Sequence, residues 1–272
     1  MFFLYHRKSR PTGEVLARAL GLYRGESTDS VPNSWRPQDV LIRWGNQGGN
    51  PGGTRFNRVI NTPTALALAS DKLRTLQVLR EAGVRVPDFS TDPTDLEYPF
   101  LGRKTNHSKG RDVVLCLQKG DYARKPRDYY VQYIPTLREF RVHVAFGNVI
   151  RVQGKYLDVP DLAVPWIRNH AHGFRFRAPK RRLSSARIET AKSAVAALGL
   201  DFGAVDLLLG DDNLEYILEV NTAPACSPLT AEAYIRAFAD TLQLPSTQLD
   251  SGALQSLRTD AEDIGGEEEE NE

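Results

Sequence analysis

Three oxygen-bearing side chains in the last third of the sequence could hold a hard cation. Glu219 and Asn221 are two residues apart in an apolar stretch typical of a strand, so they share one face of it. Asp206 lies in the preceding apolar stretch, and Gly-Asp-Asp-Asn at 210–213 predicts a hairpin turn between the two. Pairing across that turn places Asp206 opposite Ile217 or Glu219, on the side of Asn221. The three side chains therefore predict a Mg²⁺ site, which also suits Mn²⁺; the alternative is the solvent face of an amphipathic strand.

The segment after Asp206 resembles part of a known family. Glu-Val-Asn-Thr-Ala-Pro at 219–224 resembles the metal-binding end of the ATP-grasp ligases, most closely the group that includes the ribosomal-protein glutamate-adding ligases. Three earlier segments resemble motifs of that family in the same order: 61–87 with Asp71-Lys72 early in a helix, 98–115 with its phosphate loop, and 128–155 with the hinge. Four motifs in order over residues 61–240 are more specific than any one of them.

The resemblance implies an ATP-grasp fold, which combines α/β with α+β architecture. We expect a small N-terminal open α/β domain at 1–62, a small lid subdomain at 63–128 and a C-terminal subdomain with the metal site at 129–245. The last two would clamp ATP. The segment 246–272 has little apolar content and ends in a run of acidic residues, so we predict a disordered acidic tail there.

The resemblance also implies which residues bind ATP. The first phosphate-binding lysine of the family lies seven residues before the loop glycine, and counting back from Gly110 gives Arg103, with Lys104 one step out of phase. Because side chains alternate along a strand, only one of the two can point inward. We favour Arg103 as the phosphate ligand and keep Lys104 as the second candidate. The alternative is that both belong to an exposed basic strand end. The hinge backbone would pair with adenine, and Glu139 would meet the ribose. The full expected set is Lys72, Arg103, Lys104, Ser108, Gly110, Gln132, Tyr133, Ile134 and Glu139.

Charged side chains alternate along the two strands expected after the hinge. Glu139 and Arg141 share a face of the first strand, and Arg151, Gln153 and Lys155 share a face of the second. We predict Arg141, Lys155 and Arg151 as the catalytic cations that meet the γ-phosphate and the acyl phosphate formed from it. The alternative is a solvated sheet edge.

A run dense in Arg, His and aromatic residues follows at 166–177. Its position suits an acceptor pocket, to which we assign Arg168, His170 and His172. The two histidines share a face if the segment is extended, which permits a metal, but two ligands alone make a weak site. Basic residues that alternate with phenylalanine can also stack on bases, so nucleic acid is open as a partner, although it is not favoured.

These expectations imply an ATP-dependent carboxylate–amine ligase. A carboxylate would attack the γ-phosphate, and an amine would displace phosphate from the acyl phosphate to give an amide or peptide bond, with ADP and phosphate released. The expected partners are ATP, an unidentified carboxylate and an amine acceptor such as an amino acid or peptide. Two alternatives are a kinase-like phosphotransferase of the same fold and a non-catalytic module that binds nucleotide or nucleic acid.

Composition limits the class of protein. The 272 residues are 41% hydrophobic and 25% charged, which is typical of globular chains. No run of eighteen apolar residues exists to span a membrane, and residues 1–7 lack the features of a signal peptide. Two cysteines exclude a disulfide scaffold and a cysteine-based zinc site, and they fit a cytoplasmic location. Outside the acidic end, at 259–272, basic residues exceed acidic ones by nine and most are arginine, which favours anionic partners.

The expected elements must position these residues. A glycine-rich segment at 46–53 predicts a loop, either on the substrate side or a plain connector. Apolar spacing predicts helices at 12–20, 61–69, 71–82, 185–198 and 231–242. It predicts strands at 2–5, 39–44, 99–101, 112–117, 128–134, 139–146, 148–155, 203–209 and 216–220.

Overall fold

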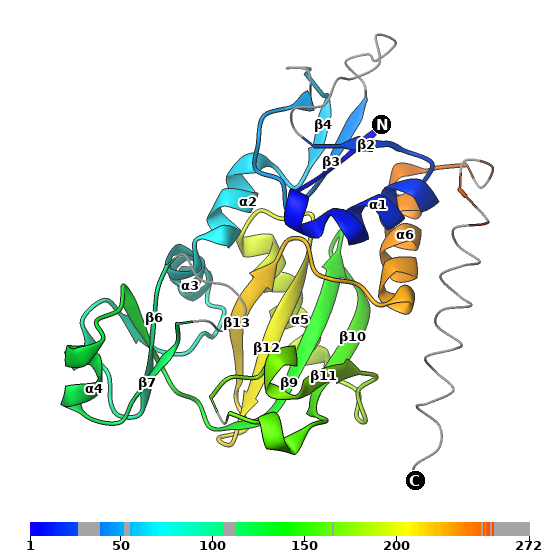
Figure 1. Ribbon diagram of the computed structural model, residues 1–272. Helices are drawn as coiled ribbons and strands as arrows, with labels where there is room; N and C mark the ends of the chain where they lie inside the picture. The colour runs from blue at the N-terminus through cyan, green and yellow to red at the C-terminus, as the bar shows by residue number, and fades with distance from the viewer. Residues whose placement is uncertain are drawn as a thin grey trace.

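The computed structural model of the protein describes residues 1–26, 39–51, 55–105, 112–164, 166–245, 247, 249–250 and 252. Three β-sheets organise this part of the chain, with helices packed on them (Figure 1). None of the helices described is both long enough and apolar enough to span a membrane.

The N-terminal sheet is a small parallel sheet. Its strand order is β2 (Tyr23–Gly25), β1 (Phe2–Tyr5), β3 (Val40–Trp44) and β4 (Arg58–Ile60). Helix α1 (Arg10–Ala19) connects β1 to β2 and packs on one face of the sheet, together with the C-terminal helix α6 (Pro228–Leu242). A parallel sheet needs such crossovers, and the strands here are accordingly short and apolar.

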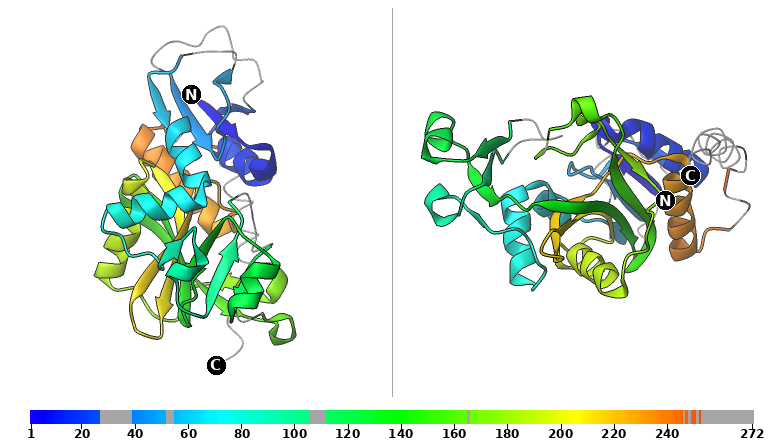
Figure 2. Two further views of the ribbon diagram at one scale, coloured as in Figure 1. Left: turned by 90° about the vertical axis from the view of Figure 1, so that its left-hand side faces the viewer. Right: turned by 90° about the horizontal axis from the view of Figure 1, so that it is seen from below.

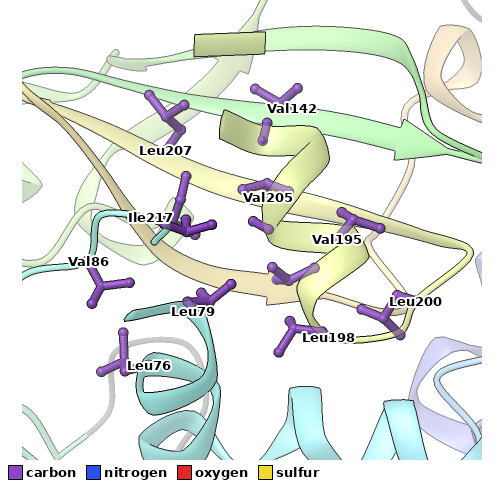
Figure 3. Packing of buried hydrophobic residues seen from close by; sticks show 14 of the residues in the cluster. Leu76, Leu79, Val86, Val142, Val195, Leu198, Leu200, Val205, Leu207 and Ile217 are labelled. Atoms are coloured by element: carbon purple, nitrogen blue, oxygen red, sulfur yellow. The ribbon is translucent and has the colours of Figure 1, made fainter. Parts of the chain in front are cut away.

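The central sheet is antiparallel throughout. Its order is β11 (Phe174–Arg177), β10 (Asn148–Leu157), β9 (Thr136–Ala145), β12 (Phe202–Gly210) and β13 (Glu215–Asn221). Helices α2 (Pro63–Ser70), α3 (Lys72–Glu81) and α5 (Ser185–Ala197) cover one face. Figure 3 shows apolar side chains of α3 and α5 meeting those of the sheet. The buried residues of this layer include Leu76, Leu79, Val142, Val195, Leu198, Val205, Leu207 and Ile217. The opposite face is left to carry polar side chains.

The small sheet lies to one side of the central sheet in Figures 1 and 2. It has the order β5 (Phe89–Ser90), β8 (Tyr129–Gln132), β6 (Phe100–Arg103) and β7 (Val114–Cys116), all antiparallel, with α4 (Lys119–Arg124) beside β7. Phe100, Cys116 and Tyr130 form a buried cluster of its own. The strand expected at 128–134 thus pairs in the small sheet and not in the C-terminal subdomain to which it was assigned.

An aromatic cluster joins the N-terminal sheet to the central sheet. Trp44 of β3 stacks on Phe202 of β12, with ring centroids 5.2 Å apart, and meets Tyr234 of α6 edge-on at 5.0 Å. Phe3 and Phe202 both pack edge-on against Phe238 of α6, at 6.1 and 5.2 Å. These contacts make one continuous core out of segments at the two ends of the chain.

The expected helices and the longer strands are present, with ends moved by a few residues. The strands β2, β4, β5 and β11 and the helix α4 were not predicted, because elements of two to six residues carry little periodicity. The disordered acidic tail expected at 246–272 is wrong at its start: Leu249 packs on the aromatic core, and the Asp250 N–H donates to the Ala19 carbonyl. Apart from residue 252, the chain beyond 250 lies outside the described residues.

Candidate active site

A row of polar side chains crosses four strands on the open face of the central sheet. Glu219 of β13 pairs with Asp206 of β12, Asp206 with Arg141 of β9, and Arg141 with Gln153 of β10. Directly opposed residues point to the same side of a sheet, so all four lie on one face. Asp206 therefore faces Glu219, one of the two pairings expected from the hairpin. Toward the turn the register shifts by one residue after Asp206, an irregularity that the sequence did not predict.

The three expected metal ligands come together at the end of β13. The Asn221 amide donates to Oε1 of Glu219 at 3.0 Å, and Lys72 at the start of α3 forms an ion pair with the other oxygen of Glu219. Burial would raise the pKa of Glu219, but Lys72 and Arg141 lower it well below its usual range. The described residues contain no group of three His, Cys, Asp or Glu side chains suited to a metal. Two carboxylates and an amide are oxygen donors that fit Mg²⁺.

Arg141 is bound to Asp206 in a bidentate ion pair. Nε lies 2.7 Å from Oδ1 and Nη2 lies 2.9 Å from Oδ2. Both side chains are largely buried, and although burial would lower the pKa of Arg141, the Asp206 carboxylate raises it. The guanidinium is therefore a fixed positive charge in the middle of the row.

Lys155 and Glu139 form the neighbouring ion pair. They are directly opposed on β10 and β9, and both are more than nine-tenths buried. Burial raises the pKa of Glu139, an effect that Lys155 opposes. Phe176 of β11 lies beneath both cations, with its ring centroid 4.4 Å from Cζ of Arg141 and 5.3 Å from Nζ of Lys155. One aromatic ring thus holds the two predicted catalytic cations side by side.

Arg151, the third predicted catalytic cation, lies elsewhere. It is opposite His143, further along the face toward α6. There it lines a groove between β10 and α6, together with Glu232 and Arg236. The spacing places it on the correct face, but α6 covers that end of the sheet. Arg151 therefore does not join Arg141 and Lys155.

The small sheet brings Arg103 toward the row. Burial raises the pKa of Tyr129, and the nearby charges of Arg103 and Lys72 oppose this shift. Lys104 is exposed. Hydrogen bonds from Thr105 lower the pKa of Asp128, and the charge of Lys104 adds to this effect. The structure thus places Arg103, and not Lys104, beside the other polar residues. Ser108 and Gly110 lie outside the described residues.

The hinge connects the small sheet to β9. The backbone N–H groups of Gln132 and Tyr133 donate to the carbonyls of Asp88 and Pro99, and the Gln132 side chain also donates to Pro99, at 2.9 Å. Among the described residues, only the N–H of Ile134 in this segment has no hydrogen-bond partner. Pairing of adenine with this segment would therefore depend on Ile134 for its donor.

The segment assigned to the acceptor divides between two places. Arg168 lies over Phe174 at 5.1 Å and opposes the raised pKa of Glu139, so it is close to the row. His170–His172 is a 3-10 turn and not an extended segment, so the condition under which the two histidines would share a face is not met. His172 meets the Asn169 side chain at 2.7 Å, and His170 is exposed.

The glycine-rich loop approaches the metal ligands closely. Gly45 has φ +67°, and a Cβ there would lie 2.7 Å from Cβ of Ala223, two residues after Asn221. Arg43 is fully buried and donates to the carbonyls of Asn46 and Gly48 at 3.0 and 2.7 Å, which fixes the loop. The start of the loop therefore lies beside the end of β13, and a role in substrate binding stays a prediction.

Two polar residues of the face were not predicted as site residues. Gln153 was recognised only as sharing the face of Arg151 and Lys155. His143 continues the alternation of Glu139 and Arg141 along its strand but was not singled out. The register of β9 with β10 brings them together. No spacing within either strand could have shown this pairing.

Comparison with known proteins gives matches in sequence and in fold, but no family model matches the chain. It is 28% identical over 182 residues to a probable alpha-L-glutamate ligase of Mannheimia succiniciproducens, covering 61% of this chain and 59% of the relative. It is 25% identical over 193 residues to a D-alanine–D-alanine ligase of a Synechococcus strain, covering 61% and 58%. The chain thus spans about three fifths of the length of these curated relatives.

Solved structures match over nearly the whole chain. The D-alanine–D-alanine ligase from Bacillus anthracis superposes with a TM-score of 0.63 at 14% identity, covering 95% of this chain and 98% of the other. An ATP-grasp protein with a RimK domain from Sphaerobacter thermophilus gives 0.60 at 16% identity, covering 87% and 97%. The resemblance seen in the four motifs is confirmed at the level of the fold: the chain has the ATP-grasp fold. Its sequence is similar to those of proteins named as probable alpha-L-glutamate ligases.

Proposed function

We propose that the protein is an ATP-dependent ligase that joins a carboxylate to an amine through an acyl phosphate. The observation that carries this proposal is the convergence, on one sheet face, of two fixed cations with an oxygen-rich ligand set. Arg141 and Lys155 lie side by side over Phe176, and Arg141 adjoins Asp206, which faces Glu219. The relatives named as ligases of glutamate and of D-alanine support the same class of reaction.

In this proposal Asp206, Glu219 and Asn221 hold Mg²⁺, which when bound supplies charge neutralisation for the phosphates of ATP. Arg103 and Lys72, whose charges both act on Tyr129, would bind phosphate oxygens. Such positioning and electrostatic stabilisation are the main contributions of a protein to phosphoryl transfer.

The reaction needs no nucleophile from the protein. A substrate carboxylate oxygen attacks the γ-phosphorus, and the bond from that phosphorus to the oxygen of ADP breaks. The amine nitrogen then attacks the carbonyl carbon, the bond from that carbon to the phosphate oxygen breaks, and phosphate leaves with the electron pair and a proton from the amine. Arg141 and Lys155 stabilise the three charged oxygens of the phosphoryl group in the first step.

The substrates we propose are amino acids or peptides. The names of the curated relatives point to an amino acid as the carboxylate or the amine. Arg168 near Glu139 and the loop fixed by Arg43 supply further polar groups around the row. These groups suit a small zwitterionic molecule better than a nucleic acid.

The test is to trap the acyl group. The protein is incubated with ATP, Mg²⁺ and each L-amino acid or D-alanine in turn, with hydroxylamine as the amine, and ADP, phosphate and hydroxamate are measured by mass spectrometry. We expect one or more acids to yield all three products. A phosphorylated product without free phosphate would instead indicate a kinase, and no ADP with any acid would indicate a binding module.

A matched pair of variants assigns the cations. Lys155→Ala should lower the hydroxamate yield by at least about tenfold, with ADP affinity changed much less, because the cation acts mainly on the transferring group. Arg182→Ala removes an exposed cation outside the site and should leave the yield unchanged. Equal effects of the two variants would contradict the role of Lys155.

A further inference from the structure

A neutral amide lies beside Arg141 in the row. Gln153 pairs with Arg141 across β10 and β9, and only 8% of its surface is exposed. The other three members of the row are charged. Because a buried amide must satisfy its hydrogen bonds, the partners of Gln153 determine which of its atoms can meet a substrate.

His143 and Tyr234 fix the orientation of Gln153. Oε1 of Gln153 lies 3.1 Å from Nε2 of His143, and Nδ1 of His143 lies 3.1 Å from the hydroxyl of Tyr234. His143 and Tyr234 are both fully buried, and Tyr234 is held in the aromatic cluster by Trp44 and Phe202. The hydroxyl therefore has one position, and so does the imidazole bound to it.

This chain of contacts sets the polarity of the amide. A carbonyl oxygen can only accept, so Nε2 of His143 donates to Gln153. Burial lowers the pKa of His143 to about 4, so near pH 7 the ring is neutral and its Nδ1 accepts from the Tyr234 hydroxyl. The NH₂ group of Gln153 is turned away from His143 and has no hydrogen-bond partner among the residues described.

The position of Gln153 indicates which part of a substrate it meets. Glu219, in the metal-ligand set, is three strands away on the same face, about 14 Å at the usual strand spacing. Arg141 lies between them. If phosphate is held near Glu219 and transferred beside Arg141, the group that receives it lies toward Gln153.

We propose that Gln153 donates an amide N–H to an oxygen of the substrate carboxyl group, with His143 and Tyr234 as positioning residues. This inference rests on the proposed ligase function. When the amine attacks the carbonyl carbon, the C=O electron pair moves onto oxygen, and a donor already aimed at that oxygen stabilises the negative charge. The C=O bond re-forms as the bond from carbon to phosphate breaks, and phosphate leaves with the electron pair and the amine proton.

Turnover of Gln153→Leu is the first test, with the acid that gives the most hydroxamate. Loss of one such donor should lower kcat by about 100-fold, with the KM for ATP changed less than about twofold. Tyr234→Phe should lower kcat in the same direction, also without a change in that KM. Gln77→Leu, the same change on an exposed helix face, should behave as the wild type. Wild-type kcat in Gln153→Leu would overturn the inference, whereas a wild-type protein that forms no hydroxamate would refute the ligase proposal instead.

The second test does not depend on turnover. In ¹⁵N NMR of the full chain, His143 should carry its proton on Nε2, and Tyr234→Phe should lose this single tautomer. With Mg²⁺ and ADP present, acetate as the carboxylate probe should shift the Gln153 NH₂ signal, which is assigned by its absence in Gln153→Leu. A proton on Nδ1 of His143, or an NH₂ signal that does not respond to acetate, would overturn the inference.

Discussion

The ion pair between Arg141 and Asp206 makes a quantitative prediction about stability. Arg141→Met keeps an aliphatic stem over Phe176 but removes both donors to Asp206, whose surface is only 5% exposed. Removing one partner of a buried pair costs about 3–5 kcal/mol, because the remaining charge has no compensation. Arg141 is itself about one-sixth exposed, so we expect the lower end of that range. For a chain of this size about 3 kcal/mol lowers the melting temperature by about 6–12 °C.

The assay is thermal unfolding by circular dichroism of four proteins: wild type, Arg141→Met, Asp206→Asn and the double variant. The double variant leaves no unpaired charge, so its loss should be smaller than the sum of the single losses by at least about 1 kcal/mol. Arg177→Met is the control, because it breaks an exposed pair with Asp158 and should cost less than about 1 kcal/mol. A fall below about 2 °C in Arg141→Met, or strictly additive losses, would refute the reasoning.

Three further predictions concern the metal ligands, the buried histidine and the loop. Glu219→Gln and Asn221→Ala should each keep the wild-type circular dichroism spectrum yet lose at least about 3 kcal/mol of transition-state stabilisation; turnover near wild type in either would remove it from the ligand set. Burial lowers the pKa of His143 in the folded state below its ordinary value. The stability that comes from burying the neutral ring is therefore complete above pH 6.5 and is lost as the pH falls toward 4. Between pH 7 and 5 the wild type should therefore lose about 2 kcal/mol more than His143→Gln in urea unfolding, and parallel pH profiles would contradict this. Gly45→Ala adds a Cβ 2.7 Å from that of Ala223 at a positive φ, so it should cost about 1–3 kcal/mol in urea unfolding, and an unchanged urea midpoint would disprove the close approach.

The sequence predicted most where the information is local. The hairpin between β12 and β13 limits Asp206 to two partners, which follows from the two-residue period of a strand and needs no knowledge of the rest of the fold. The preference for Arg103 over Lys104 needed the seven-residue spacing of the family's motif as well as strand alternation. The order of the motifs was enough to indicate the ATP-grasp superfamily.

The partners of the charged residues could not be predicted in the same way. Lys72 and Glu219 are 147 positions apart, and Arg141 and Asp206 are 65 apart, so their pairing depends on strand order and on where α3 begins. Arg151 lies apart from the two other predicted catalytic cations because α6 covers its end of the sheet, which the spacing within one strand does not reveal. The two-residue spacing places His143 on the face of Glu139 and Arg141, but a single histidine there is equally compatible with a plain core position.

The aromatic cluster also constrains how the chain reaches this structure during synthesis. Trp44 meets Phe202 and Tyr234, which are made about 160 and 190 residues later. At about 5–20 residues per second the ribosome needs roughly 10–40 s for that stretch, far longer than a small sheet needs to form. Throughout this interval the apolar face that carries Phe3 and Trp44 has no α6 to cover it. The nascent N-terminal segment is therefore the part of the protein most in need of a chaperone, and its own strands become protected only when the last helix arrives.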